Sequence, residues 1–144
     1  MTPRLFPETR EEMSISPNEE STAEDASEIL VAALRAACDK KARDMVVLDL
    51  RKVASFTDYF LISTGASTRQ ARTISDSVEQ ALRAAGRRPM HSEGYSNGEW
   101  ILLDYGDLIV HTFVEATRKF YDLERLWRDA ERVPLDLDED GRGK

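Results

Sequence analysis

Residues 100–114 decide the fold, and their sequence is Trp-Ile-Leu-Leu-Asp-Tyr-Gly-Asp-Leu-Ile-Val-His-Thr-Phe-Val. Two apolar runs rich in strand-forming residues are joined there by Gly106 and Asp107, which is typical of a β-hairpin. If Gly106 is the first central residue of a type II′ turn, its missing Cβ permits the positive φ that this turn requires. The pairing register then places Tyr105 opposite Leu108.

This register divides the hairpin into two different faces, because successive side chains of a strand point to opposite sides of the sheet. One face is almost entirely apolar and consists of Ile101, Leu103, Tyr105, Leu108, Val110 and Thr112. The other mixes large apolar groups with a carboxylate and an imidazole, and consists of Trp100, Leu102, Asp104, Ile109, His111 and Phe113. We expect the first face to be core and the second to be a functional surface.

The composition favours one domain in a soluble, cytoplasmic protein. The chain has 144 residues, of which 41% are hydrophobic, enough for a single core. No apolar run approaches the roughly 20 residues of a membrane-spanning helix. The one cysteine, Cys38, excludes an intramolecular disulfide and a cysteine-based zinc site, and its helical apolar surroundings predict a place in the core.

The net charge of −7 is concentrated at the two ends of the chain. Residues 1–28 hold eight acids and two bases, and residues 132–144 hold four acids and three bases, so that 15 of each remain in between. A near-neutral folded part does not suit a protein that grips nucleic-acid phosphates. Composition therefore favours a protein partner over bare RNA or DNA.

Capping and periodicity predict the remaining elements. We expect a helix from the capping box Ser21–Glu24 to about Lys41, a second from the capping box Ser67–Gln70 to Gly86, and a short final helix on Phe120, Leu123, Glu124 and Trp127. Strands are predicted over 45–50, 59–64 and 88–93. The predicted organisation is an acidic disordered extension (1–20), one α/β domain (21–131) and a flexible tail (132–144).

A nucleotide-handling enzyme is the alternative that these residues leave open. Gly65-Ala66-Ser67 precedes a helix, as in sites that hold a triphosphate at a helix N-terminus. However, no close pair of acidic residues follows it, and Asp49, Asp58 and Asp104 come from separate elements. Ser67 is explained more simply as a helix cap. Two histidines without a close spacing also disfavour a zinc enzyme.

Four segments resemble, in order and spacing, the Iojap family of ribosomal silencing factors. They are Thr57-Asp-Tyr-Phe-Leu-Ile-Ser-Thr-Gly-Ala-Ser-Thr-Arg-Gln70, Glu93-Gly94, Trp100-Ile-Leu-Leu-Asp-Tyr-Gly-Asp-Leu-Ile-Val-His111 and Arg118-Lys-Phe-Tyr-Asp-Leu-Glu-Arg-Leu-Trp127. Each motif alone is weak, whereas four in series make a chance match improbable. The resemblance covers residues 26–127, and the chain departs from it in its long acidic N-terminus and its short tail.

This resemblance implies a mixed sheet flanked by helices, similar to the nucleotidyltransferase fold, but a function without catalysis, cofactor or metal. A member of the family would bind the fourteenth protein of the large ribosomal subunit, block joining of the small subunit and repress translation when nutrients are short. A minor contact with rRNA and a homodimer in the free state stay open. Carried over residue by residue, the family's partner-binding positions fall on Trp100, Asp104 and Tyr121, and further on His111 and Trp127.

The residues themselves also allow structural roles at these positions. Asp104 and His111 are diagonal neighbours in the predicted register and could hydrogen-bond to each other. Trp127 could pack on the sheet instead of contacting a partner, and Tyr121 is open to either role. Trp100 is favoured as a contact, because it begins a strand on the mixed face, and tryptophan is enriched among binding hot spots.

Overall fold

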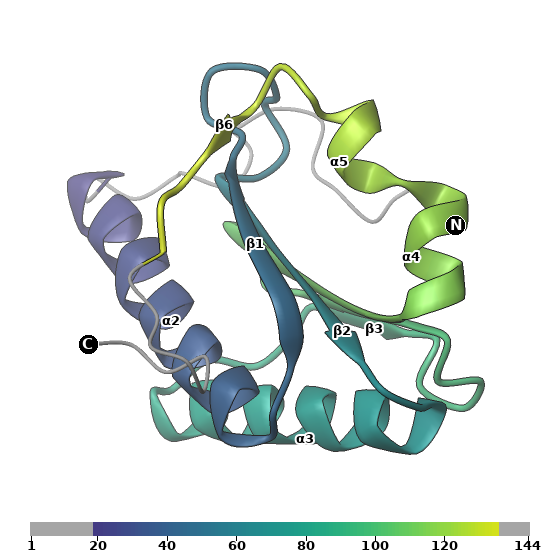
Figure 1. The fold of residues 1–144 in the computed structure, drawn as a ribbon. Helices are drawn as coiled ribbons and strands as arrows, with labels where there is room; N and C mark the ends of the chain where they lie inside the picture. The colour runs from purple at the N-terminus through teal and green to yellow at the C-terminus, as the bar shows by residue number, and fades with distance from the viewer. Residues whose placement is uncertain (1–18, 136–144) are drawn as a thin grey trace.

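A six-stranded mixed sheet runs through the computed structural model, which describes residues 19–135 (Figure 1). The strand order is β3-β4-β5-β2-β1-β6, and within the described residues the β2–β5 pair is parallel and the other four pairs are antiparallel. In chain order the elements are α2 (Glu19–Asp39), β1 (Arg43–Asp49), β2 (Tyr59–Gly65), α3 (Thr68–Ala84), β3 (His91–Glu93), β4 (Trp100–Asp104), β5 (Leu108–Val114), α4 (Glu115–Tyr121), α5 (Leu123–Leu126) and β6 (Glu131–Arg132). The described residues thus form the single α/β domain that the sequence predicts.

The central hairpin of β4 and β5 has the predicted register. Asp104 pairs with Ile109 and Trp100 with Phe113, and the N–H of Tyr105 donates to the carbonyl of Leu108 at 2.8 Å. Gly106 has a φ of +89°, which a residue with a Cβ rarely adopts. The predicted register and the positive φ of Gly106 are therefore confirmed, and with them the assignment of each hairpin side chain to one side of the sheet.

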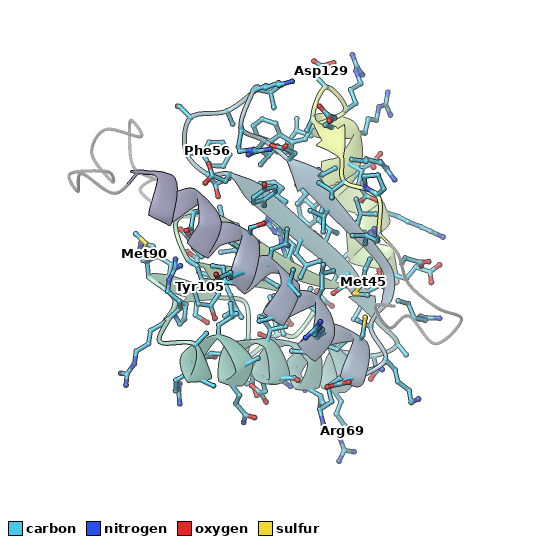
Figure 2. The ribbon with its side chains drawn as sticks, turned by 90° about the vertical axis from the view of Figure 1, so that its left-hand side faces the viewer. Met45, Phe56, Arg69, Met90, Tyr105 and Asp129 are labelled. Atoms are coloured by element: carbon cyan, nitrogen blue, oxygen red, sulfur yellow. The ribbon has the colours of Figure 1, made fainter. Side chains whose placement is uncertain are left out.

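The uniformly apolar face is the main core, and helices α2 and α3 cover it (Figure 1). Leu103, Leu108 and Val110 pack there with Val47 and Leu61 from the neighbouring strands. The helices contribute Ile29, Leu30, Ala33, Ile74, Val78 and Leu82. Figure 2 shows Tyr105 and Met45 on this side of the sheet, next to α2, whereas Arg69 points away from α3. Cys38 is buried, as predicted.

The second capping box is confirmed, and the first is not. Ser67 caps α3 by accepting the N–H of Gln70 at 3.1 Å, and the Gln70 side chain accepts the N–H of Ala66. Helix α2 is described from Glu19 onward, so Ser21 lies inside the helix rather than capping it. It ends at Asp39, slightly before the predicted Lys41.

The mixed face carries a second core, covered by α4 and α5. Leu123 and Trp127 pack there with Phe60, Ile62, Leu102, Ile109 and Phe113. The sequence predicts one final helix, but Asp122 takes a left-handed conformation with φ 49°, which divides it into α4 and α5. Arg118 fastens this segment: its guanidinium donates to Thr64 at 2.7 Å and to Glu124 at 2.9 and 3.3 Å.

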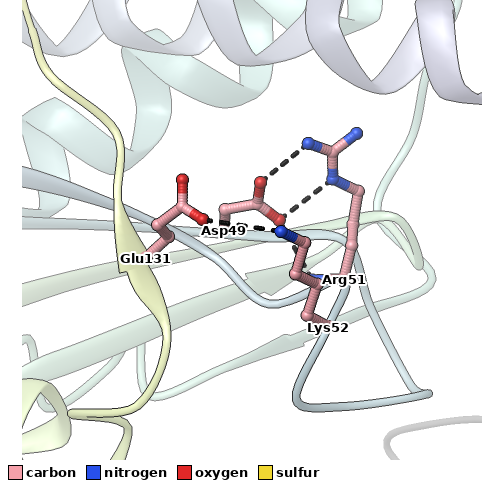
Figure 3. Close-up of polar contacts among 4 residues, drawn as sticks. All are labelled: Asp49, Arg51, Lys52 and Glu131. Carbon is pink, nitrogen blue, oxygen red and sulfur yellow. Dashed lines mark hydrogen bonds and ion pairs between the residues drawn. The ribbon is translucent and has the colours of Figure 1, made fainter.

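The predicted boundary between domain and tail falls inside β6. Arg132 pairs with Leu48 of β1, and the N–H of Val133 donates to the carbonyl of Val47 at 2.9 Å. Two residues are too short a strand for any periodicity to reveal. Figure 3 shows the polar contacts at this edge, where Lys52 approaches Glu131 at 4.0 Å. The predicted extension 1–20 lies, apart from its last two residues, outside the described part of the chain.

Candidate functional site

Trp100, at the start of β4, is the centre of an aromatic cluster on the mixed face. Its ring stacks on Phe113 with centroids 5.0 Å apart, and Tyr121 from the end of α4 lies on it at 4.7 Å. The indole N–H donates to Nδ1 of His111 at 3.1 Å. Trp100 is half-buried, whereas Tyr121 is 50% exposed. Trp100 thus lies between the core of this face and Tyr121, which is at the surface.

A pocket of about 230 Å³ opens beside these rings. Its walls are Glu93, Gly94, Trp100, Leu102 and Tyr121, and we call it the aromatic pocket. Gly94 is required there, because it has a φ of +85° and a Cβ on it would lie 1.9 Å from the carbonyl oxygen of Trp100. Glu93-Gly94 is one of the four segments that carry the family resemblance, but nothing in the sequence showed that it lines a pocket with Tyr121.

The loop between β3 and β4 is tied to α3. The Arg72 guanidinium donates to the carbonyl of Ser96 at 3.2 Å, and the Tyr95 hydroxyl donates to Asp76 at 2.9 Å. Gly98 is buried against α3, where a Cβ would lie 2.9 Å from Cβ of Thr68. These contacts hold the backbone that leads into Trp100 against α3.

His111 lies beneath Trp100 and is only 3% exposed. Burial lowers the pKa of its imidazole to about 3, so the ring is neutral near neutral pH. An indole nitrogen can only donate, which makes Nδ1 of His111 the acceptor and places the imidazole proton on Nε2. Among the described residues Nε2 finds no hydrogen-bond partner. His111 is therefore not an exposed contact residue.

Asp104 serves the hairpin turn rather than the aromatic pocket. Its side chain is fully buried, Oδ1 accepts the N–H of Gly106 at 2.8 Å, and Oδ2 has no partner among the described residues. Burial raises the pKa of this carboxyl. The suggested hydrogen bond between Asp104 and His111 is wrong, because each group uses another partner: the turn amide in one case and the indole of Trp100 in the other.

Trp127 packs between two phenylalanines instead of lining the aromatic pocket. Its ring meets Phe56 and Phe60 edge to face, with centroids 5.6 and 6.0 Å apart. Phe60 in turn lies 4.5 Å from the His111 ring. The structure therefore brings Tyr121 and His111 each into contact with Trp100, connects Trp127 to His111 through Phe60, and leaves Asp104 apart.

The acidic residues weighed for the enzyme alternative do not converge. Asp49 lies on β1 and Asp104 on β4, three strand positions apart in the sheet, which is roughly 14 Å at the usual strand spacing. They also face opposite sides, since Asp104 shares the mixed face with Leu48, the neighbour of Asp49. Asp49 is bonded to Arg51 at 2.7 and 3.0 Å, which lowers the pKa of its carboxyl (Figure 3). Within residues 19–135 no group of three metal-binding side chains occurs.

Comparison with known proteins gives this geometry its context. The model of a family described as "Ribosomal silencing factor during starvation", RsfS, matches residues 23–144. This chain belongs to the RsfS family. The predicted resemblance to the Iojap group is thus confirmed, and the name of the family describes a regulator of ribosomes. Among the described residues no helix is long and apolar enough to cross a membrane.

Individual RsfS relatives span most of the domain. The ribosomal silencing factor RsfS of Chromobacterium violaceum is 39% identical over 103 residues, which cover 72% of this chain and 84% of that protein. The chloroplast protein Iojap of Zea mays is 32% identical over 122 residues, 81% of this chain and 52% of that one. The mouse protein named "Mitochondrial assembly of ribosomal large subunit protein 1" is 30% identical over 103 residues, 69% of this chain and 44% of that one.

Solved structures of related proteins share the fold. A crystal structure of a Chromobacterium violaceum protein superposes with a TM-score of 0.69 at 36% identity, covering 78% of this chain and 92% of that one. A second, from Bacillus halodurans, has a TM-score of 0.68 at 35% identity and covers 76% of this chain and 99% of the other.

Proposed function

We propose that this RsfS-family protein binds the large ribosomal subunit at its fourteenth protein through the aromatic pocket. Bound there, it blocks joining of the small subunit and represses translation under nutrient limitation. Membership of the RsfS family supports a ribosomal partner. The choice of the fourteenth protein rests on the resemblance to the Iojap group, and the choice of the aromatic pocket rests on its geometry.

The observation that carries the site assignment is the half-exposed Tyr121 ring, which lies tilted against Trp100 at 4.7 Å where both rings line the aromatic pocket. Tryptophan and tyrosine dominate binding hot spots, because they present large rigid surfaces with a polar tip. Hot spots also sit in preformed hollows that exclude water once the partner is bound. The aromatic pocket provides both features on one side of the sheet.

Such a protein would act by occupying a surface, and its charge fits a protein partner. Residues 29–131 hold 15 acids and 15 bases, so the domain lacks the positive field of an RNA-binding protein. A standard protein interface buries about 800 Å² on each side, far more than the aromatic pocket offers. We therefore expect the pocket to form the centre of a wider contact that includes the exposed side of α4.

Tyr121→Ala is the sharpest test, because half of this side chain is exposed and the fold depends on it little. Truncating a hot-spot aromatic costs about 2 kcal/mol of binding free energy, which is roughly thirtyfold in Kd. Val31→Ala is the matched control, since Val31 is 46% exposed on α2, on the opposite side of the sheet. Affinity for the isolated fourteenth protein is measured by calorimetry, together with thermal unfolding.

Subunit joining tests the functional part of the proposal. Added to separated ribosomal subunits, the protein should reduce the joined-ribosome peak in a sucrose gradient without added nucleotide or metal. Tyr121→Ala should restore that peak, and Val31→Ala should behave as wild type. A folded Tyr121→Ala protein with unchanged affinity would remove the site assignment. An unchanged gradient alongside metal-dependent nucleotide turnover would favour the enzyme alternative instead.

A further inference from the structure

We propose that His111 is a positioning residue, which holds the Trp100 indole in the orientation that partner binding uses. The expected effect on partner binding rests on the proposed function, whereas the contact between His111 and Trp100 does not depend on any partner. Trp100 and His111 lie on adjacent strands, where Trp100 is paired with Phe113 and His111 with Leu102. They are diagonal neighbours on one face, and the indole N–H reaches Nδ1 of His111 at 3.1 Å.

Two phenylalanine rings pack against the imidazole. The Phe60 ring meets it edge to face at 4.5 Å, and Phe113 lies nearly parallel to it at 6.2 Å. With 3% of its surface exposed, the imidazole is enclosed by protein, which favours a single orientation. Because it stays neutral well below neutral pH, Nδ1 keeps a lone pair for the indole throughout the physiological range.

Simple core packing does not explain a histidine at this position. The neighbouring side chains of the mixed face are Leu102, Ile109 and Phe113, and an aliphatic residue would suit them. A buried imidazole N–H without a partner is unfavourable, and Nε2 of His111 is such a group among the described residues. Among residues 19–135 the His111 side chain makes one hydrogen bond, to Trp100. An aliphatic side chain could not accept this hydrogen bond from the indole N–H.

The bond matters because stacking alone leaves the indole free to rotate. The torsion that joins an aromatic ring to its Cβ has broad minima, so the contacts with Phe113 and Tyr121 do not by themselves determine which edge of the indole faces outward. The N–H bond to His111 directs the nitrogen edge toward the buried imidazole. Trp100, held in this way, lines the aromatic pocket with Glu93 and Leu102. A wall fixed before binding avoids the entropy loss of ordering it on binding.

The test compares two substitutions of similar size. His111→Asn keeps an oxygen near the place of Nδ1, whereas His111→Leu keeps the volume and loses the acceptor. Both are made in a Trp127→Phe background, so that a single indole N–H signal remains in nuclear magnetic resonance spectra. We expect His111→Leu to keep the fold, to exchange its indole hydrogen faster and to bind the isolated fourteenth ribosomal protein about tenfold more weakly, as for one side chain that must be ordered on binding. His111→Asn should retain slow exchange and near wild-type affinity.

The outcomes are separable. Equal indole exchange in wild type and His111→Leu would overturn the positioning role, and so would a folded His111→Leu protein with faster exchange but wild-type affinity. If either variant fails to fold, the nitrogen resonances of wild-type His111 decide: a proton on Nδ1 would contradict the proposal, and a proton on Nε2 would support it. Failure of the proposed function would give a different result. Tyr121→Ala would then bind the fourteenth protein as wild type does, while the indole exchange rate would still depend on the residue at position 111.

Discussion

Lowering the pH should destabilise this protein through His111. Its pKa is about 3 in the folded state, against 6.5 for an ordinary histidine. Since the folded pKa is the lower one, the unfolded chain binds more protons between these values, and stability falls as the pH falls from 6.5 toward 3. At about pH 5 the protonated form of His111 outnumbers the neutral form roughly thirtyfold in the unfolded chain, while the folded ring stays neutral. The free energy of unfolding is therefore about 2 kcal/mol lower than at pH 7.

Urea unfolding at the two pH values measures this effect, with His111→Asn as the reference that cannot titrate. Wild type should lose about 2 kcal/mol more than His111→Asn on going from pH 7 to pH 5. The raised pKa of Asp104 acts in the opposite direction, because there the folded state binds the proton more tightly, but it is present in both proteins and cancels. Equal losses in wild type and His111→Asn would refute the reasoning.

Two further substitutions test the cap of α3 and the backbone at Gly94, beside the aromatic pocket. Ser67→Ala should lower the free energy of unfolding by about 1 kcal/mol, because α3 loses its cap. Ribosome affinity should not change. If wild type binds a nucleoside triphosphate and this variant does not, the N-terminus of α3 is an anion site instead. Gly94→Ala should lower Tm much more than Gly86→Ala does. Both glycines have a positive φ, but only at Gly94 would the new Cβ clash with the backbone, at the carbonyl of Trp100. Similar losses in the two glycine variants would contradict the close approach.

The sequence was sufficient for the hairpin because its information is local. Gly106 determines the turn, the turn determines the register, and alternation assigns each side chain to a face. The cap of α3 was predictable for the same reason, since Ser67 and Gln70 are only three residues apart. Strand pairing between β2 and β5, by contrast, joins segments far apart in the chain and has no local signature.

The site was predicted in part, because the burial of the mixed face is a tertiary property. Trp100 and Tyr121 do meet at the surface, but no pattern after Val114 shows that α4 and α5 fold back over the strands. That fold depends on the left-handed Asp122, a conformation that this residue adopts only occasionally. Likewise, the spacing of Asp104 and His111 made a mutual bond plausible, whereas the competing donors became visible only in three dimensions.

The edges of the sheet restrict how a partner can approach. The inner strands β1, β2 and β5 have seven residues each, but β3 at one edge has three and β6 at the other has two. Short edge strands offer few unpaired amide and carbonyl groups as a template for another chain. Assembly by strand addition, whether into aggregates or onto a ligand, is thereby disfavoured for this domain. At β3 and β6, recognition by side chains on a face of the sheet is therefore favoured over strand addition.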